Sequence, residues 1–412
     1  MNINQRFKCS ACETHIDARL GMSNRDIQPI RFACLKCGEG IEITVSHYES
    51  IRVTGAELVP FEGPFDGSNP FVDIHIDFPV SFDKYVMGET PFMKAVTRIG
   101  HGNFAIHNFR LDSLNYLYKK VDALKRILRL YSKNPDLFGR LCKKEFDEEL
   151  RSTDQKDINL ALYCVLAKVF YPFAMPNDNA EAVELYMDLM AGLHNDKKDA
   201  FELFLKEIVD TDFLKNLQKD CLEIYPEILS SELALRPALF LDFDDDYEKE
   251  LVGFRVSVDD FQKYKDLYKD ISEILSRQLV IVGGLNNLLH RGDHNSFNDI
   301  GKHTPKNMNK FADVAFGQKS EHLDDCWYEI GDGVIDNQLR NSIAHYKAEY
   351  DEISQIITYY PRKEGIKQEK SETLYFLDFM RKILISYREM HRLHQLIKCL
   401  FNYYFIIYEP NA

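Results

Sequence analysis

The chain has 412 residues, of which 45% are hydrophobic, and a formal net charge of −14. This length and composition are enough for two or three domains with buried cores. The negative charge argues against a protein that binds nucleic acid over its whole surface, although a local basic groove could still hold RNA. The sequence shows neither a signal peptide nor the roughly 20 apolar residues of a membrane helix, so we expect a cytoplasmic protein that does not enter a membrane.

Two C-x-x-C pairs lie near the start of the chain, and the other five cysteines are scattered. The pairs consist of Cys9, Cys12, Cys34 and Cys37. This spacing is typical of a zinc ribbon, so we expect residues 1–50 to bind one Zn²⁺ ion through four thiolates. Gly38 supports the second pair because it can take a positive φ, whereas Glu13 follows the first pair. His15 is the alternative ligand to one of the cysteines. With four protein ligands the ion has no open position, which indicates a structural role.

The ribbon is rich in basic side chains, which permits contact with a nucleic acid. These side chains are Arg6, Lys8, Arg19, Arg25, Arg31 and Lys36. Because a structural ion carries out no chemistry, we expect the ribbon to recognise a partner.

The next two regions differ in their hydrophobic period. In residues 51–105, segments 51–59 and 71–78 alternate apolar and polar side chains, which predicts a small β-rich unit. From residue 106 the period becomes helical, and we expect a helical middle domain over 106–240. The histidines His75, His101 and His107 could belong to a hydrolase in the β-rich unit, but no motif supports that alternative.

An acidic run from Asp242 to Glu250 separates the middle domain from the last block, and such runs usually form solvated linkers rather than metal sites. We expect residues 255–410 to form a helical bundle, with helices over 261–289, 334–350 and 372–407. Gly283 and Gly284 within the first of these helices indicate close packing of another helix rather than a kink. The predicted fold class is therefore mainly α, with a small N-terminal zinc ribbon and β-rich unit.

One late segment carries a candidate active site, with the sequence Asp336-Asn-Gln-Leu-Arg340-Asn341-Ser-Ile-Ala-His345. It resembles the R-x(4–6)-H motif of HEPN domains, the higher eukaryotes and prokaryotes nucleotide-binding superfamily. The resemblance covers residues 255–410, with Arg340, Asn341 and His345 at the motif positions. It implies a metal-independent endoribonuclease that works as a homodimer, in the manner of toxins and anti-phage effectors, and leaves a 2′,3′-cyclic phosphate.

The chemistry of RNA cleavage gives a physical reason for these residue types. An imidazole can take the 2′-OH proton near neutral pH, and a guanidinium can stabilise the negative charge that develops on the phosphate. On an ideal helix Arg340 lies roughly 140° around from His345, so one chain offers half a site and a symmetric dimer would complete it. A second pair with similar spacing, Arg388 and His394, lies on an amphipathic helix whose charged residues we expect to face solvent.

Two functions therefore remain open at this point. The first is a HEPN-type endoribonuclease with RNA as substrate and with a phage component or an antitoxin as further partner. The second is a non-catalytic HEPN-like protein that dimerises or binds RNA and uses the ribbon for recognition. In the second case His345 is satisfied within the bundle and Arg340 forms an ion pair with Asp336. The histidines of the polar loop, His290 and His294, are interpreted as part of a turn.

Overall fold

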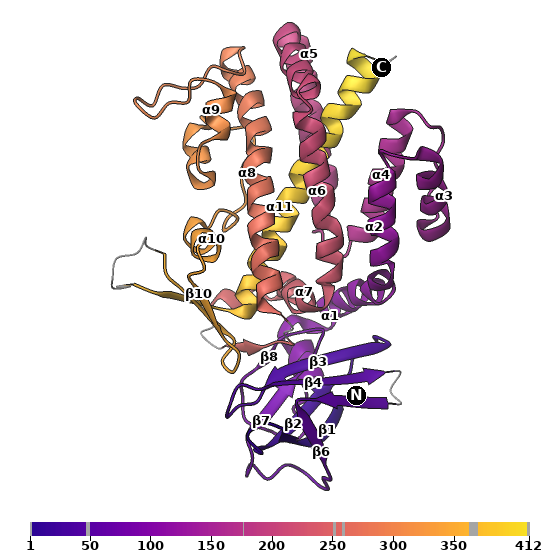
Figure 1. Ribbon diagram of the computed structural model, residues 1–412, viewed down its shortest axis with the longest axis vertical. Helices are drawn as coiled ribbons and strands as arrows, with labels where there is room; N and C mark the ends of the chain where they lie inside the picture. The colour runs from indigo at the N-terminus through magenta and orange to yellow at the C-terminus, as the bar shows by residue number, and fades with distance from the viewer. Residues whose placement is uncertain are drawn as a thin grey trace. The chain divides into compact units, whose positions relative to one another are not determined.

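A computed structural model describes residues 2–46, 50–175, 177–249, 253–257, 260–361 and 370–409 (Figure 1). Helices predominate among these residues, and small sheets occupy the N-terminal region, which confirms the predicted fold class. The chain divides into two compact units, each built from three segments. The first unit comprises Met1–Lys119, Ser230–Lys265 and Asn341–Leu384, and the second comprises Lys120–Leu229, Asp266–Arg340 and Ile385–Ala412. No helix in the described ranges is long and apolar enough to cross a membrane.

Two sheets form the N-terminal part of the first unit (Figure 1). One has the strand order β6-β1-β2-β7 and consists of β1 (Asn2–Cys9), β2 (His15–Gly21), β6 (Ala56–Val59) and β7 (Phe71–Ile74). The other is antiparallel, with the order β3-β4-β5, and consists of β3 (Ile27–Ala33), β4 (Gly40–Ser46) and β5 (Ser50–Thr54). Strands from the ribbon range 1–50 thus pair with strands from the range 51–105 in the first sheet.

These sheets share one apolar core. Phe7, Ile16 and Leu20 from one sheet lie in a single buried cluster with Ile30 and Ile43 from the other. β3 and β4 alternate buried and partly exposed residues, as expected for strands with one face on a core, whereas β2 lies inside its sheet and is buried beyond His15. The ribbon is therefore part of a larger β-structure.

The remaining elements of the first unit come from three parts of the chain. The strands are β8 (Val80–Ser81), β9 (Phe254–Arg255), β10 (Ala348–Asp351), β11 (Ile356–Tyr359) and β12 (Glu372–Tyr375). The helices include α1 (Pro91–Leu117), α7 (Glu232–Phe240), the beginning of α8 (Phe261–Arg291) and of α11 (Phe376–Tyr403), the end of α10 (Asn337–Ala344) from Asn341 on, and the short 3₁₀ helices Leu241–Phe243 and Tyr247–Lys249. β8 pairs with β9, and β10, β11 and β12 form a three-stranded antiparallel sheet.

A buried ionic network joins these segments. Arg236 of α7 is fully buried and donates to Glu232 at 2.6 Å, to Asp77 at 2.7 Å and to Asn115 at 2.8 Å. Glu232 also accepts from Arg25. Because buried carboxylates are stabilised by such partners, the network ties the N-terminal β-structure to α1 and α7.

Replacing Arg236 by Met should therefore destabilise the protein strongly. The substitution leaves the carboxylates of Asp77 and Glu232 buried without their shared cation, which costs about 3–5 kcal/mol when one partner of a buried pair is removed. Urea denaturation would measure the loss. As a control, Lys125→Met removes an ion pair with Glu227 whose two side chains are about half exposed, and it should change stability by less than about 1 kcal/mol.

Two aspartates of the acidic run are buried in ion pairs. Asp242 accepts from Arg110 at 2.6 Å and from Arg381, and Asp244 forms an ion pair with Arg98. The side chains of both aspartates are almost completely buried. The interpretation of this run as a solvated linker is thus wrong for these two residues, since their charges are compensated by arginines distant in sequence. Glu250 lies outside the described residues.

The second unit is a helical assembly. Its helices are α2 (Val121–Leu130), α3 (Pro135–Phe146), α4 (Gln155–Phe170), α5 (Asp178–Asp210), α6 (Phe213–Ser230), α9 (Met308–Ala312), most of α8 and α11, and the start of α10 (Asn337–Ala344), with a 3₁₀ helix at Phe316–His322 and a π-helical turn at Tyr404–Tyr408. Hydrogen bonds connect α8 with three other long helices of this unit. Lys197 of α5 donates to Leu288 O at 2.8 Å, and Gln278 donates to Cys221 Sγ of α6 at 3.4 Å and to Met390 O of α11 at 3.0 Å.

Close packing explains the two adjacent glycines of α8. A Cβ at Gly283 would lie 2.5 Å from the ring of Phe311, and one at Gly284 would lie 2.5 Å from the ring of Phe204. The helix continues through both glycines to Arg291. The prediction of close approach rather than a kink is confirmed.

Buried histidines of α11 join a chain of hydrogen bonds in the core of the second unit. The hydroxyl of Tyr225 lies 2.7 Å from Nδ1 of both His391 and His394, and Tyr163 lies 3.1 Å from Nε2 of His394. Burial lowers the pKa of His391 to about 4 and also lowers the pKa of His394. Both imidazoles are therefore neutral in the folded protein.

Acidification should consequently destabilise the protein well before its carboxylates titrate. As pH falls below about 6.5, the unfolded chain protonates these histidines while the fold keeps them neutral, so stability present at pH 7 is lost toward pH 4. The slope is at most about 1.4 kcal/mol per pH unit for each buried histidine. Urea midpoints at pH 7, 6 and 5 would measure it. The slope should flatten in His394→Gln and stay unchanged when the exposed His101 is replaced by Asn.

The last third of the chain departs from the predicted helices. The helix expected over 334–350 ends at Ala344 and is followed by β10, and the helix expected over 372–407 begins with β12 before α11 starts at Phe376. β11, with the sequence Ile-Ile-Thr-Tyr, pairs with both strands. The helical prediction is wrong at these places because β11, rich in β-branched residues, forms a strand between them, and its backbone pairs with residues 348–351 on one side and 372–375 on the other.

Candidate functional site

The four cysteines of the ribbon lie on two turns of nearly identical backbone geometry. In the first, Cys9 N donates to Thr14 O at 2.9 Å and Glu13 N donates to Cys9 O at 3.0 Å. In the second, Cys34 N donates to Glu39 O at 2.8 Å and Gly38 N donates to Cys34 O at 2.9 Å. Both residues that follow the second cysteine of a pair have positive φ, 79° at Gly38 and 58° at Glu13. The first turn therefore adopts the same shape although its sequence lacks the glycine.

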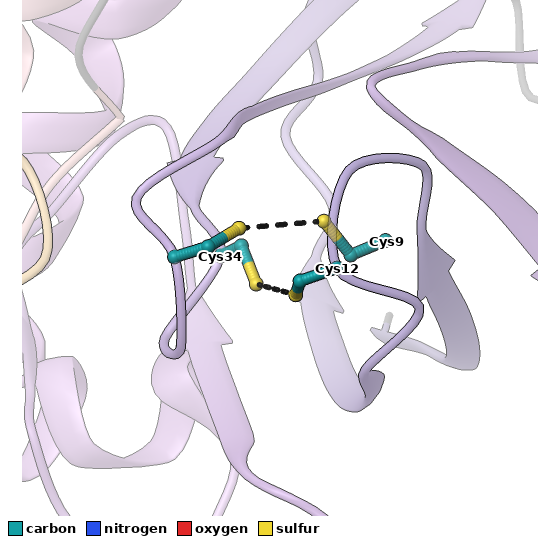
Figure 2. Close-up of side chains that lie close together, drawn as sticks. Cys9, Cys12 and Cys34 are labelled. Carbon is teal, nitrogen blue, oxygen red and sulfur yellow. Dashed lines mark hydrogen bonds between the residues drawn. The ribbon is translucent and has the colours of Figure 1, made fainter.

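The sulfur atoms converge from these two turns, as Figure 2 shows. The Sγ atoms of Cys9 and Cys37 are 3.8 Å apart, and those of Cys12 and Cys34 are 3.6 Å apart. All four lie within 4.8 Å of one another. Four sulfurs at roughly 2.3 Å from a tetrahedral ion are about 3.8 Å apart, so the geometry fits a single metal ion.

The protein surroundings affect the thiols of the cluster differently. A hydrogen bond with the Thr14 side chain lowers the pKa of Cys12 to about 6, which favours the thiolate that binds metals. Burial raises the pKa of Cys34. A backbone hydrogen bond at Glu39 lowers the pKa of Cys37, but hydrogen bonding with Cys12 and burial outweigh it and raise this pKa to about 12, so metal binding would have to displace these protons. Cys9 and Cys34 are buried, whereas Cys37 is exposed. Within the described part of the chain the metal-binding group contains these four cysteines and not His15, which is exposed at the start of β2. The predicted metal-binding residues are thus brought together.

The basic side chains of the ribbon are largely paired inside the first unit. Arg19 and Arg25 are buried in ion pairs with Asp73 and Glu232. Further ion pairs join Arg6 with Asp17 at 2.6 Å, Arg31 with Glu42 at 2.8 Å, and Lys8 with Glu13 at 3.6 Å. These carboxylates compensate the positive charge that the sequence suggested for binding a nucleic acid. The expected basic surface is therefore much weaker than the count of arginines and lysines indicated.

Residues 340–345, called segment 340–345 below, lie on α10 and the turn that follows it. Arg340 and Asn341 are in the helix, and His345 comes directly after its last residue, Ala344. Asn341 and His345 are exposed, and 28% of the Arg340 side chain is exposed. Because His345 follows the helix, the angular separation of an ideal helix does not apply to its side chain. Tyr346, with a φ of 58°, continues the turn.

Local contacts fix each end of α10. Asp336 caps the helix, since its Oδ1 accepts from Leu339 N at 3.0 Å. At the other end His345 N donates to Asn341 O at 3.0 Å. The Arg340 guanidinium donates to Glu273 of α8. Sequence reasoning missed Glu273, because no sequence pattern connects two residues so far apart in the chain.

The second arginine–histidine pair has a different environment. His394 is fully buried within the hydrogen-bonded chain described above, and Arg388 donates to Phe173 O at 2.6 Å. The expectation that these charged residues face solvent is wrong for His394. His394 therefore has no access to a ligand in solution.

The other histidines considered in the sequence have structural contacts. His75 and His107 are buried beside Asp77, the former 3.1 Å from its N–H and the latter 3.1 Å from its carbonyl oxygen. His294 lies 2.9 Å from Glu207 and belongs to a turn in which Ser296 N donates to Asp293 O at 3.1 Å, as predicted. His290, in contrast, lies near the end of α8. The contacts of His75 and His107 belong to the core of the first unit, which does not support a hydrolase there.

The geometry defines a mainly helical protein of two compact units, one of which carries a four-cysteine centre suited to a metal ion. Comparisons with protein-family models, with curated proteins and with solved structures find no match to this chain.

Proposed function

We propose that this chain is a metal-independent endoribonuclease of HEPN type, with Arg340, Asn341 and His345 as its active-site residues. The observation that carries the proposal is the exposure of Asn341 and His345, next to a partly exposed Arg340, on one short helix and its following turn. An imidazole that reaches solvent can take the 2′-OH proton, and a neighbouring guanidinium can stabilise the phosphate.

The active form that we propose is a homodimer in the cytoplasm, with RNA as its substrate. HEPN-type sites combine residues of two chains, and a two-fold axis near segment 340–345 would bring two arginines and two histidines to one phosphate. A role as a toxin or anti-phage effector, with an antitoxin or a phage component as partner, belongs to the same proposal and rests on the family resemblance.

We assign the ion of the four-cysteine cluster as Zn²⁺. Four thiolates at tetrahedral spacing are the ligand set of structural zinc sites, and no position remains for a reacting group. The ion would stabilise the junction of the two N-terminal sheets. Since most ribbon cations are already paired, this stabilising role has better support than direct binding of RNA.

A non-catalytic protein is the second candidate, and one observation favours it. Arg340 already has an anionic partner in Glu273, so its charge could serve the packing of α10 rather than catalysis. In this case the segment would contribute to dimerisation or RNA binding without cutting the RNA.

Incubation of the purified protein with labelled single-stranded RNA separates the two candidates. The endoribonuclease should yield products that carry 2′,3′-cyclic phosphate and 5′-OH ends in the presence of EDTA added after folding. Binding without any cleavage would favour the second candidate.

A further inference from the structure

The guanidinium of Arg340 is held by an acidic residue within the second unit. Its Nη2 donates to Oε1 of Glu273, which lies on α8. The two side chains are 28% and 50% exposed, so solvent reaches the pair. Both residues belong to the same compact unit, and the contact does not depend on the placement of the first unit.

Neighbouring contacts hold α10 against this face of α8. A Cβ on Gly317 would overlap the side chain of Asn337, the first residue of α10. Lys319 donates to the carbonyl oxygen of Ser276 at 2.7 Å, three residues after Glu273 on the same helix. Residues 316–322 therefore contact both α8 and the start of α10, and these contacts hold the two helices that carry Glu273 and Arg340.

The carboxylate of Glu273 occupies a donor of Arg340 that an RNA phosphate would need. Carboxylates and phosphates bind a guanidinium through the same N–H groups, so the two anions compete. Release or neutralisation of Glu273 would let a phosphate take its place at Nη2 of Arg340.

We propose that Glu273 is an autoinhibitory residue, which restrains Arg340 until an RNA phosphate displaces it. This inference rests on the proposed endoribonuclease function. A solvent-exposed ion pair contributes little free energy, so an RNA phosphate can displace Glu273 from Arg340. Loss of the Glu273 charge should raise the cleavage rate at subsaturating RNA by about two- to fivefold, which is the change in an equilibrium constant that the free energy of an exposed ion pair produces.

The test compares wild type with Glu273→Gln, which removes the charge and keeps the size of the side chain. The matched control is Asp220→Asn, because Asp220 forms a similarly exposed ion pair with Arg277 of α8 in the same unit. Initial rates of RNA cleavage are measured at equal protein concentration, and circular dichroism checks the fold of each variant. We expect the two- to fivefold increase in E273Q and no increase in D220N.

Each outcome decides the inference. An unchanged or lower rate in E273Q, with an active wild type, overturns the autoinhibitory role and leaves the endoribonuclease proposal standing. An equal gain in D220N also overturns it, because the effect would then reflect overall charge. If no variant cleaves RNA, both proposals are wrong.

A second measurement tests whether Glu273 acts through Arg340. Fluorescence anisotropy compares RNA binding by two double variants, R340A with E273Q and R340A with D220N. Because Arg340 is absent from both, E273Q should not strengthen RNA binding more than D220N does.

Discussion

His345→Ala should abolish RNA cleavage while leaving the fold intact. If the imidazole is the general base, its loss removes the group that takes the 2′-OH proton, and the rate should fall by about 10²–10⁴-fold. The side chain is exposed in the turn after α10, so its removal creates no cavity in the core. Cleavage of labelled RNA by purified protein measures the effect.

The matched control for this experiment is His303→Ala, which removes another exposed histidine far along the chain from segment 340–345. It should cleave RNA at the wild-type rate. Equal activity in H345A and wild type would contradict the catalytic role of His345. Sedimentation that finds only monomers in an active sample would contradict the composite dimer site, since each chain would then suffice.

Loss of the metal ion from the four-cysteine site should destabilise the N-terminal β-structure of the first unit. The four cysteines lie on the turns that precede β2 and β4, so an ion bound to them would link the two sheets. Structural zinc contributes about 10–16 kcal/mol in isolated zinc-finger peptides, and the apolar core shared by the two sheets should retain part of the fold here. We therefore expect a loss of several kcal/mol, which is a large part of the roughly 5–15 kcal/mol by which native proteins are stable.

Elemental analysis should find one zinc per chain in wild type and less than one in Cys34→Ser, whose sulfur is fully buried in the cluster. The thermal transition of C34S should shift down, and a strong chelator should shift that of wild type in the same direction. Cys164→Ser is the control, because Cys164 belongs to α4 in the second unit. It should keep one zinc per chain. Full zinc content in C34S would contradict the four-cysteine assignment.

The pairing of the ribbon cations changes what the N-terminal region can do. Arg19 and Arg25 neutralise buried carboxylates, and Arg6 and Arg31 have carboxylate partners at 2.6 and 2.8 Å. A basic residue contributes to an RNA surface only when its charge is not already compensated. The ribbon is therefore better explained as a stabilising part of the first unit than as a separate RNA-binding module.

The sequence by itself determined the features that depend on neighbouring residues. The C-x-x-C spacing predicted the metal-binding cysteines, and the helical period predicted most helices. Two ligands separated by two residues and a period of 3.6 are both local properties of the sequence. The positions of Gly283 and Gly284 predicted close packing for a similar reason, since a missing Cβ has few uses inside a helix.

The tertiary structure alone decided the partners of the charged residues. The sequence placed Asp242 in a solvated run, but its side chain is buried in ion pairs with Arg110 and Arg381. Arg340 forms an ion pair with Glu273, which is distant from it in the sequence. The tertiary structure also decided that β10 and β12 form where the sequence predicted helices, because both strands pair with β11. Ion pairs and strand ladders join residues distant along the chain, and their free energy exists only once the fold has brought those residues together.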